Sequence, residues 1–423
     1  MSLGAGEPKP GGLQLSDAQR FEWLRLLRSE RIGPRTFRAL ISRFGSARAA
    51  LEALPRLAPR DRPVRLASIE DIEREMAAAA RCGARFLGLG EADYPPLLRR
   101  IDSAPPIIAV RGDPAIFARP AVAIVGARNA SGAGLAFAER LARGLAQAGF
   151  VVVSGLARGI DIRAHQTSME SGTVAVLAGG LDRIYPAEHT EALERLLAHG
   201  AALSEMPFGW EARGRDFPRR NRIVAGLAQG TVVVEAARRS GSLITARFAA
   251  EHGREVLAVP GSPLDPRAEG TNDLLRDGAT ICTSAQDVID ALAAQIERPE
   301  PERDLFAESW PDEPDETLWD ELELPEIDAP PRAAARTKDK SFAGDSSRIG
   351  AAPYDATPGA LSLSGDPATM RSRIVALLGP TPISIDELAR ATAAPAGDVR
   401  AILLELELAG QLERQPGDLV SRL

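Results

Sequence analysis

Hydrophobic positions follow three successive spacing patterns along the chain. From about residue 16 to residue 80, apolar side chains recur every three or four positions, as in Phe21, Leu24 and Leu27 and again in Phe37 and Ile41. This spacing predicts amphipathic helices. Between residues 115 and 296, short apolar runs alternate with helical patterns, and the last 58 residues return to helical spacing. The chain is therefore expected to fold as three consecutive parts.

The middle part carries six strand-like runs, which read AVAIVGA, FVVVSG, TVAVLAGG, AALSEMP, TVVVEAA and EVLAVPG. Continuous runs of β-branched residues, separated by helices, are typical of a parallel sheet that is covered on both faces. The predicted fold class is therefore α/β, with a doubly wound parallel sheet. An N-terminal helical domain of the SAM or helix-hairpin-helix kind and a C-terminal winged helix are expected to flank it.

The boundaries follow from changes in composition. We expect a disordered leader over residues 1–14, the helical domain over 15–93, a Pro-rich connector over 94–114 and the Rossmann-like domain over 115–296. An acidic and then Pro- and Ser-rich disordered linker is expected over 297–365. The winged helix, with three helices and a hairpin around Pro416 and Gly417, takes 366–423.

The sequence does not decide what the two flanking domains bind. Gly33 and Pro34 form a tight turn near Arg31, Arg35 and Arg38, as in helix-hairpin-helix modules that contact DNA, but a simple packing turn explains them nearly as well. The third helix of the winged helix, DVRAILLELELAG, carries one Arg and two Glu. That charge suits a phosphate backbone poorly, so contact with protein is favoured over DNA reading there.

Charge and cysteine content narrow the class of protein. The 423-residue chain has a net charge of −7, yet residues 297–328 hold 14 acidic and two basic residues, which leaves the rest at +5. A nucleic-acid partner therefore remains compatible with the charge. Two cysteines 200 positions apart predict neither a disulfide framework nor a zinc site. Without a signal-like start or an apolar run of about 20 residues, a cytoplasmic protein with no membrane contact is expected.

Glycine-rich turns after the predicted strands form the candidate site. The first, GARNASGAG, offers close backbone approach and a helix N-terminus to a phosphate. It lacks the Walker A lysine and the GxGxxG spacing, so neither ATP nor a dinucleotide is indicated and no cofactor or metal is expected. The turns SGLARGIDIRAH and RRSGSLITA repeat the pattern, and FPRRNR adds a basic helix start.

Together these turns lie at the carboxyl edge of the sheet, where doubly wound folds bind ligands. The arginines would supply bidentate phosphate contacts. The candidate phosphate-binding residues are Gly126, Arg128, Ser131, Gly132, Gly134, Ser154, Gly155, Arg158, Gly159, Arg220, Asn221, Arg222, Ser240, Gly241 and Ser242.

No catalytic residues are predicted. Asp161, His165, Asp182, Glu205 and Glu235 could serve as acids or bases, but neither metal-ligand spacing nor a nucleophile elbow links them. His165 is expected to cap a helix or to pack, and Glu235 to orient a backbone N–H or to organise arginine side chains. The protein is therefore expected not to be an enzyme.

Blocks of sequence between residues 121 and 292 resemble the DNA-processing protein A (DprA/Smf) family. In order they read GAR, SGLARGID with AH, AGGLDRIYP, SEMPFG, FPRRNRIVAGL, VVEA with SGSLITA, VPG and GTNDLLRDGA. The resemblance implies an extended Rossmann-like domain that dimerises, binds single-stranded DNA in a positively charged pocket and loads the RecA recombinase during natural transformation. It implies that the pocket includes Arg128, Ser154, Gly155, Arg158, Arg220, Asn221 and Arg222.

Three positions, in two of the blocks, depart from the family pattern. Ser131 and Ala133 stand where a Thr and an aromatic residue are expected, so a base-stacking contact is missing if that aromatic provides one. Arg158 replaces a frequent Lys, which keeps the charge but changes a point charge into a planar fork. With 4% aromatic residues, binding should depend on phosphate contacts and fall steeply with salt.

Two other functions remain as alternatives. A nucleotide-processing enzyme of the lysine-decarboxylase-like phosphoribohydrolase type would share the sheet and the anion-binding loops, but its PGGxGTxxE motif is absent, the nearest string being AGGLDRIYP. A winged-helix transcription regulator with a ligand-sensing Rossmann domain would need sequence-specific duplex binding, against which the acidic third helix argues.

Overall fold

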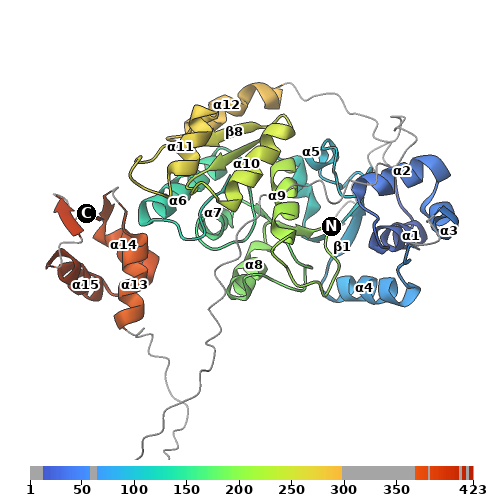
Figure 1. Cartoon of the computed structure of the whole chain (residues 1–423), viewed down its shortest axis with the longest axis horizontal. Helices are drawn as coiled ribbons and strands as arrows, with labels where there is room; N and C mark the ends of the chain where they lie inside the picture. Colours follow the sequence, from blue (N-terminus) through green and yellow to red (C-terminus); the bar gives the residue numbers. More distant parts are fainter. Residues whose placement is uncertain are drawn as a thin grey trace, which may run out of the picture.

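The computed structural model describes residues 13–57, 64–297, 367–379, 382–408, 412–415 and 419–422. Figure 1 shows an N-terminal helical part, a central sheet with helices around it, and a small C-terminal unit. The expected leader (1–14) and linker (297–365) lie outside the described residues, apart from residues 13, 14 and 297.

The N-terminal part is helical, as predicted. Its helices are α1 (Asp17–Arg28), α2 (Pro34–Phe44), α3 (Ala47–Leu57) and α4 (Ile69–Arg81). Ser16 begins α1 with a capping box, because its hydroxyl accepts from the N–H of Gln19 while the Gln19 side chain accepts from the N–H of Ser16. Trp23 and Phe37 pack edge to face at 5.0 Å. This pair joins α1 to α2 across the predicted turn.

The central sheet has nine strands in the order β1-β2-β6-β5-β4-β3-β7-β8-β9. The strands are β1 (Arg85–Gly88), β2 (Ile107–Gly112), β3 (Ala121–Val125), β4 (Val151–Ser154), β5 (Thr173–Val176), β6 (Ala201–Ser204), β7 (Gly230–Val233), β8 (Glu255–Ala258) and β9 (Thr280–Ile281). From β6 to β9 all neighbours are parallel, while β2 and β1 add antiparallel. The six predicted strand runs are all present, and the doubly wound fold class is confirmed.

The sheet begins earlier than the composition indicated. β1 lies inside the range expected for the helical domain (15–93), and β2 lies inside the expected connector (94–114). β2 pairs with β6, whose residues are about ninety positions further along the chain, from Ala109 with Ser204 to Gly112 with Ala201. β2 lies between Pro106 and Pro114, and such prolines are typical of a loop or an edge strand, so the sequence favoured a connector there.

Helices cover both faces of the sheet. They are α5 (Pro96–Arg99), α6 (Gly132–Gln147), α7 (Ile160–Ser168), α8 (Thr190–Leu196), α9 (Asp216–Gly226), α10 (Gly241–Glu251), α11 (Glu269–Arg276) and α12 (Ala285–Glu297), with 3₁₀ turns η1 (Pro114–Ala118) and η2 (Ala187–His189). Val122 and Ile124 of β3 pack with α6 and α7, whereas Ala123 faces the cluster that contains Ile223 of α9. None of the helices in the described ranges is long and apolar enough to cross a membrane.

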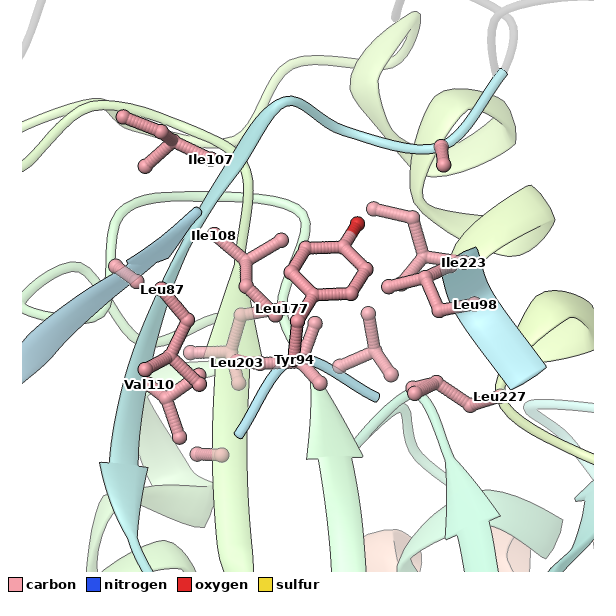
Figure 2. Close-up of a cluster of buried hydrophobic side chains, with 14 of the residues drawn as sticks. Leu87, Tyr94, Leu98, Ile107, Ile108, Val110, Leu177, Leu203, Ile223 and Leu227 are labelled. Atoms are coloured by element: carbon pink, nitrogen blue, oxygen red, sulfur yellow. The ribbon is translucent and has the colours of Figure 1, made fainter. Parts of the chain in front are cut away.

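The core beneath α9 contains one fully buried phenol. Figure 2 shows the ring of Tyr94 among Ile108, Leu98 and Ile223, between strand and helix side chains. Its hydroxyl donates to the carbonyl of Pro105 at 2.8 Å, and burial raises its pKa. The buried ring anchors the segment between β1 and β2 in the core, and the hydrogen bond closes that segment on itself.

The C-terminal unit is the predicted winged helix. It contains α13 (Pro367–Leu377), β10 (Ile383–Ser384), α14 (Ile385–Thr392), α15 (Ala396–Leu408), β11 (Leu412–Gln415) and β12 (Leu419–Arg422). The strands form a small antiparallel sheet in the order β10-β12-β11. The tip of the hairpin, with Pro416 and Gly417, lies outside the described residues. Ile374, Leu388 and Leu403 are buried between the three helices.

Candidate nucleic-acid interface

The loops that follow β3, β4, β5 and β7 meet at one edge of the sheet. These strands are parallel, and β3 has β4 on one side and β7 on the other. The chain therefore reverses its direction of progress at β3, and ligands of doubly wound sheets bind in the crevice at such a switch point. The glycine-rich turns predicted from the sequence all end at this edge.

The first turn is filled from inside the protein. Ser131 caps α6, since its hydroxyl accepts from the N–H of Gly134 at 2.9 Å. The carboxylate of Glu235 in turn accepts from the N–H of Ser131 at 2.9 Å and from its hydroxyl at 2.5 Å. A Cβ on Gly134 would lie 2.5 Å from the Glu235 carboxyl carbon. Glycine at this position therefore makes room for a protein carboxylate where a ligand phosphate was expected.

The winged helix covers the same end of α6. A Cβ on Gly132 would lie 1.7 Å from Cδ1 of Ile383. Arg267 donates to the carbonyls of Ala376 at 3.0 Å and Leu378 at 3.1 Å, at the end of α13. Such a cation suits the exposed carbonyls of a helix C-terminus. Ser131, Gly132 and Gly134 thus take part in contacts within the chain.

The second turn, after β4, closes around a buried arginine. Arg220 is 6% exposed and donates from Nη1 to the carbonyl of Val176 at 3.1 Å. A Cβ on Gly155 would lie 1.3 Å from that Nη1 atom. The carboxylate of Asp161 accepts from the N–H of Gly155 at 3.2 Å. Gly155 is therefore required by the approach of the guanidinium, and Asp161 fixes the turn.

Burial shifts the pKa of both charged groups in this turn. It lowers the pKa of Arg220 to about 10, against the raising influence of Asp161. It raises the pKa of the Asp161 carboxyl, against the lowering influence of Arg220 and of two backbone N–H groups. The Nε atom of Arg220 is buried with no hydrogen-bond partner among the described residues. The positive charge of Arg220 thus lies under the loop, directly beneath its backbone.

The remaining members of the second turn frame it. Ser154 is fully buried and donates to the carbonyl of Ile124 at 2.6 Å. Gly159 has a φ of +74° before α7, and Gly126, after β3, lies against Ile160. These residues hold neighbouring strand ends together, so they position the loops through backbone contacts.

Two exposed arginines stand at the crevice. The guanidinium of Arg128 lies over the ring of Phe217, 4.9 Å from its centroid, and Tyr185 meets the same ring edge to face at 5.3 Å. Arg158 makes two hydrogen bonds to Glu188, at 2.7 and 3.0 Å, which raise its pKa. Among the described residues, Arg128 lies within ion-pair distance of no carboxylate. Its charge is therefore available to an anion.

The other candidates lie on α9 and in the third turn, which follows β7. Asn221 donates from Nδ2 to the carbonyl of Gly241 at 3.0 Å, which joins α9 to the start of α10. Ser240 caps α10, and its hydroxyl lies 2.7 Å from that of Ser242. Asn221 is thereby brought together with the third turn.

Arg222 does not join the crevice. The residue is 5% exposed, and its side chain donates to the carbonyl of Ser103 and to the carboxylate of Glu205. Arg28 of α1 donates to the carbonyl of Glu205 at 3.2 Å and forms an ion pair with Glu75. Arg222 therefore belongs to a polar network that joins the helical domain to the sheet.

The acid and base candidates also act within the fold. His165 is fully buried, its Nδ1 lies 2.8 Å from Oγ1 of Thr173, and burial lowers its pKa to about 3. Glu235 orients a backbone N–H, one of the two expected roles. The sequence did not indicate the stacking of Arg128 on Phe217 or the pairing of Arg158 with Glu188, because these partners are distant along the chain. No group of three possible metal ligands occurs within the ranges that the structure describes.

Comparison with known proteins identifies the family. The family model of the DNA recombination-mediator protein A matches residues 85–293, the DprA-like N-terminal HHH domain matches 17–78, and the DprA winged helix domain matches 358–418. Protein Smf from Synechocystis sp. is 33% identical over 341 residues, which are 79% of this chain and 79% of that protein. The DNA processing protein DprA from Bacillus subtilis is 38% identical over 224 residues, 52% of this chain and 75% of that protein.

A solved structure has the same arrangement. The X-ray structure of DNA processing protein A from Streptococcus pneumoniae superposes with a TM-score of 0.55 at 28% identity, covering 66% of this chain and 98% of that one. The strand order, the blocks of sequence at the sheet edge and these matches agree with one another. The chain belongs to the DprA/Smf family of DNA recombination mediators.

Proposed function

We propose that this protein binds single-stranded DNA at the carboxyl edge of its sheet and passes it to a RecA recombinase during natural transformation or homologous recombination. The protein would act by binding, without catalysis, as a homodimer in the cytoplasm. The recombination-mediator role belongs to the family. The residues at the carboxyl edge of the sheet give a physical basis for DNA binding.

The exposed guanidinium of Arg128 supports the proposal most directly. It rests on Phe217 at the switch point and has no carboxylate within ion-pair distance in the described part of the chain. A stacked guanidinium keeps its N–H edge free for a phosphate, in the bidentate geometry that arginine favours. Arg158 is exposed on the neighbouring loop, and a phosphate can replace Glu188 because exposed ion pairs are weak in water.

The buried candidates would act indirectly. Arg220 would add positive potential beneath the second turn, where low solvent exposure strengthens its field. Gly155, Gly159 and Ser154 would shape the loop backbone that the strand approaches. Asn221, Ser240, Gly241 and Ser242 would fix the opposite rim. We leave Ser131, Gly132, Gly134 and Arg222 out of the DNA contact. Ser131 and Gly134 lie against Glu235, Gly132 lies against Ile383, and Arg222 pairs with Glu205.

The nucleotide-processing alternative gains no support from this edge. The helix N-terminus that would hold a nucleotide phosphate carries the carboxylate of Glu235, and a second negative charge there would be repelled. Asp161 and His165, the nearest acid and base candidates, are buried and engaged in holding the fold.

A salt titration of oligonucleotide binding tests the proposal. Fluorescence anisotropy with a labelled single strand, and with matched duplex as competitor, compares wild type with Arg128→Ala, Arg158→Ala and Arg195→Ala. Arg195 is an exposed control in the last turn of α8, which leads to the opposite edge of the sheet. Each lost phosphate contact should lower the slope of log K against log salt by about 0.7. Equal binding by all four proteins would place the DNA site elsewhere. Absence of binding by wild type would refute the proposal.

RecA loading requires a separate measurement. Wild type at low concentration should shorten the lag of RecA assembly on single-stranded DNA, and Arg128→Ala should lengthen it in proportion to its lost affinity. An unchanged lag with intact DNA binding would restrict the function to holding the strand.

A further inference from the structure

The loop between β6 and α9 carries a second arginine stacked on an aromatic ring. The guanidinium of Arg213 lies 4.6 Å from the ring centroid of Trp210. Arg213 is exposed and Trp210 is half-buried. Within the described ranges, Arg213 has no carboxylate within ion-pair distance. The pair therefore presents an uncompensated charge and a flat surface to solvent.

The pair is held by one buried carboxylate. Asp216, the first residue of α9, is 1% exposed. Its Oδ2 atom accepts from Nε1 of Trp210 at 2.9 Å and from the backbone N–H of Arg213 at 2.9 Å. Both members of the pair are thus fixed to the same atom. A binding surface that is ordered before the ligand arrives loses less conformational entropy on binding.

The backbone of this loop is also anchored to the loop that follows β5. The carbonyl of Trp210 accepts from the N–H of Gly180 at 2.9 Å, and the N–H of Gly209 donates to the carboxylate of Asp182 at 2.7 and 3.0 Å. A Cβ on Gly179 would lie 2.9 Å from the Trp210 carbonyl oxygen. Glycine at this position therefore permits the two loops to lie close together.

The two stacked pairs are neighbours across the N-terminus of α9. The guanidinium of Arg128 stacks on Phe217. Phe217 directly follows Asp216, which accepts hydrogen bonds from Trp210 and Arg213. The β5–α8 loop adds Tyr185 against Phe217 at 5.3 Å. The proposed crevice therefore continues along the sheet edge into a second cationic and aromatic surface, on the loop after β6.

We propose that Trp210 and Arg213 form a second contact for single-stranded DNA. The guanidinium edge of Arg213 binds a phosphate, and its outer face, opposite Trp210, stacks on a base. Guanidinium planes and aromatic rings both accept unpaired bases without regard to sequence. This inference rests on the proposed function, because it extends the path of the same strand beyond Arg128.

Oligonucleotide length separates the two contacts. The full-length protein is titrated with labelled oligothymidylates of about 6 and about 20 nucleotides, since such strands engage one or several adjacent contacts. Arg213→Ala should bind the longer strand about tenfold more weakly, with a salt slope smaller by about 0.7, and should bind the shorter strand like wild type. Arg128→Ala should weaken both. Arg213→Lys should keep the salt slope of wild type but lose affinity, because an ammonium cannot stack.

Tryptophan fluorescence provides a second readout. The longer strand should quench the emission of wild type more than that of Trp210→Phe, and the shorter strand should quench both equally. If Arg213→Ala binds both lengths like the Arg195→Ala control while Arg128→Ala is weakened, the second contact is refuted and the crevice stands alone. If wild type binds neither strand, the proposed function fails, and this inference fails with it.

Discussion

The carboxylate of Glu235 accepts hydrogen bonds from both the N–H and the hydroxyl of Ser131, the residue that caps α6. In many doubly wound proteins the first helix N-terminus is open and receives the phosphate of a ligand. Here the protein supplies its own anion, and Gly134 has no Cβ to obstruct it. Recognition of a phosphate backbone is therefore left to arginine side chains at the rim.

Glu235→Gln should change how stability depends on pH. Burial raises the pKa of Glu235, against the lowering influence of the two hydrogen bonds from Ser131 and of Arg267. Because the folded protein keeps this proton to a higher pH than the unfolded chain, stability falls as pH rises from about 4.3 through the folded pKa. Urea denaturation of wild type and variant should give a stability difference that is most favourable to wild type near pH 4 and declines toward neutrality.

The slope of that difference is the decisive quantity, since glutamine does not titrate. Each unit of pKa shift corresponds to about 1.4 kcal/mol. A difference that grows with pH would mean that the Ser131 hydrogen bonds outweigh burial and depress the pKa.

Gly155→Ala should disrupt the second turn without removing a charge. Its Cβ would lie 1.3 Å from Nη1 of Arg220, so the guanidinium must leave the carbonyl of Val176. Overpacking of this kind costs about 1–3 kcal/mol. Gly241→Ala is the matched control, because nothing lies within 4 Å of its Cβ and it stands in the first turn of α10.

Thermal unfolding compares the two variants, and oligonucleotide binding is measured for Gly155→Ala against wild type. Gly155→Ala should lower the midpoint and weaken DNA binding, whereas Gly241→Ala should have a midpoint at or above that of wild type. Equal midpoints would show that Arg220 can move at little cost.

Arg222→Ala should reduce stability but not DNA binding. It leaves the carboxylate of Glu205, 10% exposed in its side chain, without its cation. Removing one partner of a buried ion pair costs about 3–5 kcal/mol. The double variant Arg222→Met with Glu205→Gln should recover part of that loss. Anisotropy on folded protein at low temperature then checks affinity, and a loss as large as that of Arg128→Ala would return Arg222 to the DNA site.

Arg220 and Arg222 illustrate how much of the candidate site the sequence could predict. Apolar runs predicted six strands and therefore the sheet edge, and the glycine spacing located the loops. Positions two apart on an α-helix point about 200° apart, so Arg220 and Arg222 had to face different sides, but periodicity alone did not tell which side faces the edge. The choice depends on Glu205 and Val176, whose positions follow only from the packed sheet.

Other contacts were out of reach because they join distant segments. Glu188 pairs with Arg158 across 30 positions, and Glu235 reaches Ser131 across 104. β1 directly follows the helical segment and β2 lies between Pro106 and Pro114, and both pair antiparallel, β2 with the distant β6. Local propensity carries no information on such pairings, which depend on the closure of the whole sheet.

Arg267→Ala should release the winged helix from α6. The side chain makes two charged hydrogen bonds to the carbonyls of Ala376 and Leu378, and it is held by Asp265 at 3.1 Å. Hydrogen bonds to a charged group contribute about 1.5–3 kcal/mol each, but Ile383 still packs on Gly132. A net loss of about 2 kcal/mol corresponds to a roughly thirtyfold increase in the population of the undocked state.

Native-state hydrogen exchange measures this opening directly. The amides of α14 and of the first turn of α6 should exchange roughly thirtyfold faster in Arg267→Ala, while those of β3 and β4 should be unchanged, because the sheet does not depend on the docked unit. Arg276→Ala is the control, since that arginine pairs with Asp273 inside α11. If both variants exchange alike, the docking depends on the apolar contact of Ile383 alone, and substitution of Gly132 by a larger residue would be the change that undocks the domain.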